Sequence, residues 1–151
     1  MELLDRGASQ ISIAMSDIHS DDPARHIARL AFAIWRSVSE IKAIAQMLVS
    51  GPLEKSVGEA LAPVRRSLRD AVERGRAEGS FRRDIDAAVT ARLIEEAALG
   101  VLDVAVEHSV SDEDAHRVLA ATALGIAGLS WREARDVIES ISAPSGTRGV
   151  E

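Results

Sequence analysis

The residues of this chain that could do chemistry are four histidines and a set of acidic side chains, because it contains no cysteine. Glu113 and His116 form an E-x-x-H pattern, which bundle metalloenzymes use to bind metal from inward helix faces. A single match at a predicted helix start favours a solvated or capping position instead. His19, His26 and His108 show no recognised ligand spacing either. We therefore expect no metal, no cofactor and no enzymatic activity.

Composition restricts the class of protein further. The 151 residues are 46% hydrophobic and 28% charged, as in an ordinary soluble domain with one core. The net charge of −6 argues against a nucleic-acid surface, because phosphate binding needs basic side chains. The longest apolar run, residues 118–129, is shorter than the roughly 20 residues of a membrane helix, and no signal peptide is visible. We expect a cytoplasmic domain that binds neither nucleic acid nor membrane by itself.

The elements that would position these residues are helices, because apolar residues recur at intervals of three and four. The periodicity is strongest over residues 23–49, where Ile27 and Ile34 share one face. The pattern predicts an all-α bundle of six or seven helices, forming a single domain over residues 1–142. Residues 143–151 are expected to form a disordered tail.

Start and stop signals divide these helices. Pro63 is expected to kink or restart the helix within residues 53–78, because proline lacks the N–H that a helix interior needs. Gly79 suits the left-handed position just after a helix end. The predicted N-caps are Asp22, Asp84, Ser111 with Asp114, and Ser130 with Glu133.

Two predicted helices, 84–108 and 112–128, carry more apolar surface than one small bundle can easily bury. A helix that is apolar on all sides, as over residues 118–129, must be buried on every side. Symmetric dimerisation would bury this apolar surface between two subunits. The alternative is that the helix is the central core helix of a monomer. The expected interface residues are Ala98, Val101, Leu102, Ala105, Leu119, Ala120, Leu124 and Gly125.

Residues 75–86, with the sequence GRAEGSFRRDID, resemble a turn of many TetR-family C-terminal domains. In those domains a helix ends in G-x-x-x-G-x-[FLI]-R-x-D before the first of two dimerisation helices. Residues 21–25, DDPAR, are similar to the D-P-x-x-R entry into the ligand-domain helices of that family. Residues 99–101 and 123–129 also resemble the family pattern, so that the resemblance covers roughly residues 20–142.

The resemblance implies a fold and a function. It implies an effector-binding and dimerisation domain of a transcriptional regulator, in which a bound molecule changes the geometry of a homodimer. Residues 1–19 resemble the helix that connects this domain to an N-terminal helix-turn-helix. We therefore expect that this chain lacks a DNA-binding domain of its own.

The resemblance also implies a cavity that binds a small apolar or amphipathic effector. Trp35 is the best candidate for its wall, because the ring is wide and its N–H needs a partner. For each candidate, plain core packing is the alternative. Two other functions stay open: a helical-bundle enzyme, and a purely structural homodimer without a ligand. The candidate ligand contacts are Met15, Phe32, Ile34, Trp35, Met47 and Leu48.

Overall fold

The computed structural model describes residues 18–47 and 62–142, with side chains described over 18–37 and 62–141. This part of the chain contains five helices and no strand, which confirms the all-α prediction. The helix expected over 1–19 and the tail expected over 143–151 are outside the described residues, apart from 18 and 19. The number of six or seven helices therefore stays a prediction. The helices are α2 (Pro23–Met47), α4 (Ala62–Glu78), α5 (Ala87–Glu107), α6 (Asp112–Ala127) and α7 (Trp131–Ser142).

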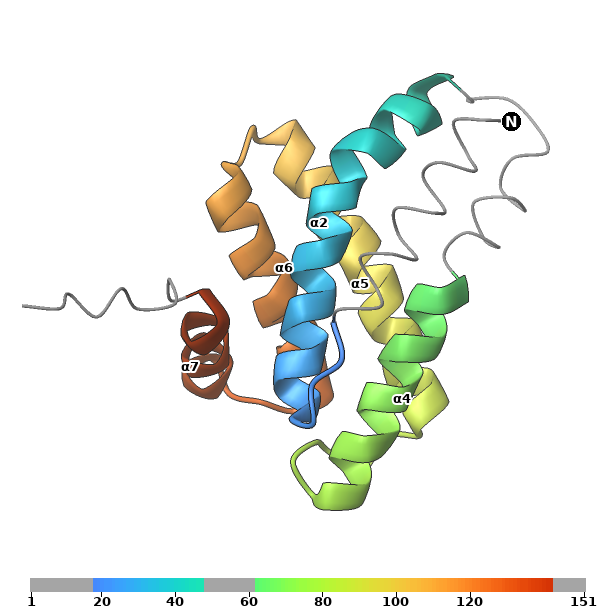
Figure 1. The fold of residues 1–151 in the computed structure, drawn as a ribbon, viewed down its shortest axis with the longest axis vertical. Coiled ribbons are helices and arrows are strands. Elements are labelled where there is room, and N and C mark those ends of the chain that lie inside the picture. The colour runs from blue at the N-terminus through green and yellow to red at the C-terminus, as the bar shows by residue number, and fades with distance from the viewer. Residues whose placement is uncertain (1–17, 48–61, 143–151) are drawn as a thin grey trace, which may run out of the picture.

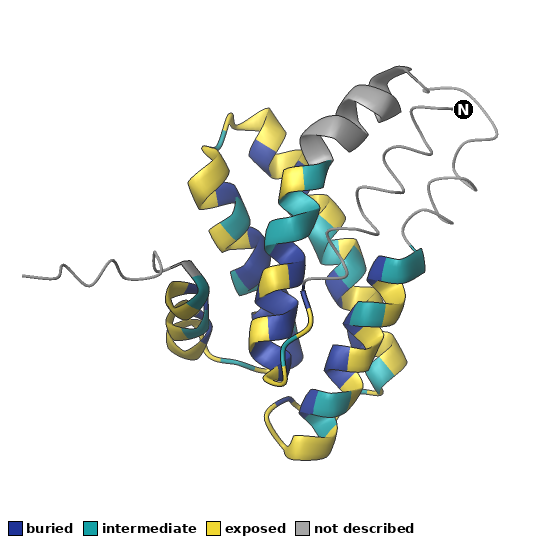
Figure 2. Cartoon of the chain, in the orientation of Figure 1, coloured by how far each residue is buried: buried dark blue, intermediate teal, exposed yellow. Residues whose placement is uncertain are grey.

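Four of these helices form a bundle, in which each packs against two neighbours in the order α2, α4, α5, α6 and back to α2. The remaining helix, α7, packs against α2 and α6 at the side of the bundle (Figure 1). The core between them is mainly aliphatic, in keeping with the aromatic content of 3%, and it also contains the buried ring of Phe81. Buried residues lie along the inner sides of the helices (Figure 2), and Ile27, Val72, Leu119 and Leu124 are almost fully enclosed. None of the described helices is long and apolar enough to span a bilayer.

Three of the predicted N-caps are confirmed by hydrogen bonds. Asp22 Oδ1 accepts from a backbone N–H of the first turn of α2 at 3.0 Å. Ser111 Oγ accepts from the N–H of Asp114 at 3.2 Å. Ser130 Oγ accepts from the N–H of Glu133 at 3.2 Å, while Glu133 accepts from the N–H of Ser130 at 3.1 Å, which completes a capping box.

The N-cap predicted at Asp84 is wrong. The cap of α5 is Asp86, which accepts from the N–H of Ala88 at 2.8 Å. Asp84 instead accepts two hydrogen bonds from the guanidinium of Arg82, at 2.7 and 2.6 Å. These hydrogen bonds lower the pKa of Asp84 to about 2. The carboxylate of Asp84 is thus held by its neighbour and does not cap the helix.

The turn after α4 has a tightly determined geometry. Gly79 has φ +81°, the left-handed conformation predicted for it. The Phe81 ring packs directly on Gly75, leaving no room for a Cβ there, and the N–H of Phe81 donates to the Gly75 carbonyl at 3.1 Å. The N–H of Arg82 donates to the carbonyl of Ala127 at 2.9 Å. The turn therefore joins the end of α4 to the end of α6 and sets where α5 begins.

Pro63 lies at the beginning of the described part of α4, so a kink or restart of the helix at this proline stays a prediction. Residues 53–61 of the predicted helix lie outside the described residues.

Candidate functional site

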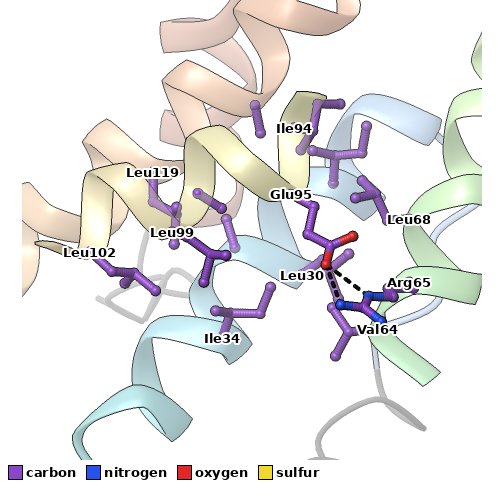
Figure 3. Close-up of a pocket in the computed structure, with 14 residues that line it drawn as sticks. Leu30, Ile34, Val64, Arg65, Leu68, Ile94, Glu95, Leu99, Leu102 and Leu119 are labelled. Atoms are coloured by element: carbon purple, nitrogen blue, oxygen red, sulfur yellow. Dashed lines mark hydrogen bonds and ion pairs between the residues drawn. The ribbon is translucent and has the colours of Figure 1, made fainter. Parts of the chain in front are cut away.

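An apolar cavity of about 120 Å³ lies between α2, α4, α5 and α6 (Figure 3). Apolar cavities of about 150 Å³ can hold one benzene molecule, so this space suits a guest of similar or slightly smaller size. Leu99 lines the cavity and is 48% exposed, so part of the wall lies at the surface. The lining residues are Ile27, Leu30, Ala31, Ile34, Val64, Arg65, Leu68, Ile94, Glu95, Ala98, Leu99, Leu102, Leu119 and Ala123.

Arg65 of α4 and Glu95 of α5 are the charged residues of this wall. Glu95 Oε1 accepts from Arg65 Nε at 2.7 Å and lies 2.6 Å from Arg65 Nη2. Arg92 Nη1 lies 3.6 Å from the same oxygen. In Figure 3 this ion pair stands at one end of the cavity, while Leu102 lies at the other. The surface of the cavity is almost wholly apolar, and the ion pair, at the end that we call the polar end, presents almost none of its nitrogen and oxygen atoms to the space.

A shallower groove adjoins the cavity on the outside of α4 and α5. Arg65, Leu68 and Glu95 line both spaces, so the ion pair stands between the cavity and the groove. The groove also contains Arg69 and Arg92. Each of these arginines has a carboxylate partner of its own, Glu73 at 3.2 Å and Glu96 at 2.5 Å respectively. The positive charge around the polar end is thus largely neutralised.

Of the ligand contacts predicted from the sequence, Ile34 lines the cavity. Phe32 and Trp35 lie elsewhere on α2, toward the start of α6. Phe32 packs edge-on against the ring of His116, with centroids 4.3 Å apart. Trp35 Nε1 donates to Asp112 Oδ1 at 3.3 Å, which provides the partner that this N–H needs. The other three candidates, whose side chains lie outside the described residues, are Met15, Met47 and Leu48.

The E-x-x-H residues do not come together in the described structure. Glu113 is exposed and pairs with Arg117 at 3.2 Å. His116 faces Phe32, and burial lowers its pKa, with a further contribution from Arg36. Its Nδ1 is buried without a hydrogen-bond partner among the described residues. Among the described side chains, those of residues 18–37 and 62–141, no group of three or more His, Asp or Glu could hold a metal ion.

The residues predicted for the dimer interface lie in three different environments. Ala98, Leu102 and Leu119 line the cavity. Ala105, Ala120 and Leu124 are buried inside the subunit, and Val101 is half-buried. Gly125 is exposed, and a Cβ placed there would meet nothing within 4 Å. Most of the expected interface residues are therefore already covered, fully or in part, by other residues of the same subunit.

A different set of residues on the same two helices is exposed. On the side away from the core, exposed apolar and small residues lie four or seven positions apart along α5 and seven positions apart on α6, so that each set shares one side of its helix. The glycine in each stripe faces open space. The helices α5 and α6 pack against each other, and we call the two stripes together the α5–α6 outer face. It consists of Val89, Leu93, Gly100, Val104, Val118 and Gly125.

A second polar cluster joins α2 to α4 around His26, which is 4% exposed. Its Nδ1 lies 3.1 Å from Arg74 Nη2, and its Nε2 lies 2.6 Å from Ser67 Oγ. A guanidinium can only donate, so Nδ1 accepts and the proton is on Nε2, which donates to Ser67. Burial lowers the pKa of His26, and the neighbouring charges of Arg74 and His19 lower it further.

Sequence reasoning named Ile34 alone among the cavity residues as a ligand contact, and it missed the residues contributed by α4, α5 and α6 as well as the other α2 residues. Helical spacing places three α2 residues on one face: Ile27, Leu30 and Ile34. The sequence therefore predicts this shared face, but it does not show that the face borders a cavity. Arg65 and Glu95 are 30 positions apart, and no local pattern connects them. Only the packing of α4 on α5 brings them together.

Comparison with protein-family models, with curated proteins and with solved structures finds no match for this chain.

Proposed function

We propose that this chain is a small-molecule sensor, namely the effector-binding and dimerisation half of a TetR-type transcriptional regulator. The observation that carries the proposal is the apolar cavity with one charged pair between α2, α4, α5 and α6. Ligand sites are commonly of this kind, mostly apolar with a few polar groups that fix orientation. The proposed role of α5 and α6 in dimerisation is supported by the exposed α5–α6 outer face.

The cavity and the outer face are carried by the same two helices. On α5, Leu99 and Leu102 line the cavity, whereas Val104 is exposed on the outer face. On α6, Leu119 lines the cavity next to the exposed Val118. A guest that prefers one spacing of these helices would therefore also favour one geometry of the dimer, by no more than its difference in affinity for the two arrangements.

The proposal is tested by a thermal-shift screen with small apolar and amphipathic compounds, followed by sedimentation of the free and the bound protein. A compound at 100 times its dissociation constant stabilises a fold by about 2.7 kcal/mol. For a domain of this size, that raises the melting temperature by roughly 5–10 °C. A broad screen without any such shift would remove the support for a sensing function.

Sedimentation then separates a sensor from a structural dimer. A dimer without any stabilising compound favours the structural homodimer, and a monomer at micromolar concentration contradicts the dimerisation half of the proposal.

A further inference from the structure

We infer that the cavity between α2, α4, α5 and α6 selects against hydrogen-bonding groups, so that its effector is a hydrocarbon of about the size of one ring. The inference rests on the proposed function, because it names the chemical class of the effector for the same cavity. Hydrocarbons such as toluene and methylcyclohexane meet this description, whereas phenols, cyclic alcohols, amines and carboxylates do not.

The wall of the cavity offers a guest almost no polar atom to bind. All of the lining residues other than Arg65 and Glu95 are aliphatic, and the surface that borders the space is almost wholly apolar (Figure 3). Ile27, Leu30 and Leu119 are each at most 2% exposed, so this part of the wall belongs to the core of the bundle. A water molecule in the cavity would find fewer than the two to four polar partners that it needs.

The ion pair at one end does not supply a polar partner either. Glu95 Oε1 accepts from Arg65 Nε at 2.7 Å and lies 2.6 Å from Arg65 Nη2, so the two side chains bind each other. Both residues also line the groove on the outside of α4 and α5, where the Arg65 side chain is 45% exposed. Because their nitrogen and oxygen atoms present almost nothing to the cavity, it is the alkyl parts of these side chains that border the space.

The selectivity follows from what a polar guest would lose. A hydroxyl group that enters the cavity leaves its hydrogen bonds to water and gains none from the wall, whereas a methyl group in the same place has none to lose. The expected cost is roughly 10- to 100-fold in affinity. A charged group would be buried without a counter-ion, which costs more. The size of the guest follows from the cavity volume of about 120 Å³, near that of cavities known to hold benzene.

The test compares guests in pairs of nearly equal shape, in which a hydroxyl group takes the place of a methyl group. The pairs are toluene with phenol, and methylcyclohexane with cyclohexanol. Titrations of the whole chain are followed by the NMR chemical shifts of its methyl groups, which also report whether the guest lies against the cavity residues. We expect each hydrocarbon to bind roughly 10- to 100-fold more tightly than its hydroxyl counterpart. The second pair shows whether the preference is independent of an aromatic ring.

A hydroxyl group added to the wall should narrow this gap. Val64 of α4 lines the cavity and is buried, and threonine has nearly the shape of valine. The hydroxyl of Val64→Thr can accept a hydrogen bond from phenol, so we expect the ratio of toluene affinity to phenol affinity to fall by about two- to tenfold. Val72→Thr, at a buried position of α4 that does not line the cavity, is the matched control and should keep the ratio.

The outcomes separate this inference from the proposed function. Equal or tighter binding of the two hydroxyl compounds would overturn the inference and leave a sensor of amphipathic molecules intact. An equal change of the ratio in both variants, or no change in Val64→Thr, would also overturn it, and if that variant does not fold, the two pairs in the natural chain decide alone. Binding of none of the four compounds would overturn the inference, and the thermal-shift screen then decides the proposed function: a shift with another compound keeps a sensing function, whereas no shift removes it too.

Discussion

The ring of Phe81 lies directly on the backbone of Gly75, in the space that a Cβ would occupy. Gly75 sits inside α4, where glycine costs about 1 kcal/mol relative to alanine, so the close contact explains why glycine suits this position. We expect Gly75→Ala to lower the free energy of unfolding by about 1–3 kcal/mol, because overpacking outweighs the gain in helix propensity. Urea denaturation followed by circular dichroism measures the change.

The control for this prediction is a double-mutant cycle with Phe81→Leu. The smaller side chain should make room for the added methyl group, so the two substitutions together should destabilise the fold less than the sum of their separate effects. Strict additivity would show that the ring of Phe81 is not the obstacle.

The α5–α6 outer face can be tested with two valines on one helix. Val104 is 53% exposed on the outer face, and Val106 is 49% exposed on the other side of α5. We expect Val104→Arg to convert a dimer to monomer, because it buries an unpaired charge in the interface, whereas Val106→Arg should leave the dimer intact. Sedimentation velocity at micromolar concentration distinguishes the two. An equal response of both variants would place the interface elsewhere.

Filling the cavity should stabilise the free protein and abolish binding. The half-buried Ala98 faces the cavity from α5, and leucine there would occupy much of the 120 Å³. We expect Ala98→Leu to raise the free energy of unfolding by about 0.5–2 kcal/mol and to remove the thermal shift caused by a ligand. Ala77→Leu, on the exposed side of α4, is the matched control and should keep that shift. A ligand shift that persists in Ala98→Leu would locate binding outside the cavity.

The buried His26 should make stability depend on pH. Its pKa is lowered in the folded state by burial and by Arg74, whereas the unfolded chain titrates near pH 6.5. Below about pH 6.5 the unfolded state binds a proton that the folded state resists. The contribution of His26 is therefore fully present above that pH and is lost as the pH falls toward the folded pKa. Urea denaturation between pH 8 and pH 5 measures this loss.

The control is His26→Gln, which should flatten the dependence of unfolding free energy on pH over this window. His116 also has a lowered pKa, so His116→Gln measures its separate contribution of the same sign. An unchanged pH dependence in the His26 variant would mean that other groups are responsible.

The candidate site could be predicted from the sequence only in part. Trp35 was favoured because its N–H needs a partner, and in the structure this N–H donates to Asp112, 77 positions away. Leu102 and Leu119 were assigned to a subunit interface, yet they line the cavity. In both cases the residue type was informative, whereas the direction in which the side chain points depended on packing.

The helical class and most helix ends could be predicted from the sequence, because they depend on interactions over a few residues. The bonds of Asp22, Ser111 and the Ser130–Glu133 capping box each connect positions two or three apart. The wrong N-cap prediction at Asp84 also has a local cause, because the carboxylate of Asp84 binds Arg82, two positions away, and does not cap the helix.

Which sides of α5 and α6 face inward depends on how the helices pack together. Over residues 118–127 the helix α6 is apolar on every side, so the sequence pattern does not indicate which side faces inward, and the rotation of the helix is set by the helices packed against it. The same holds for the polar end of the cavity. Arg65 and Glu95 belong to different helices, and their contact of 2.7 Å exists only because α4 packs on α5.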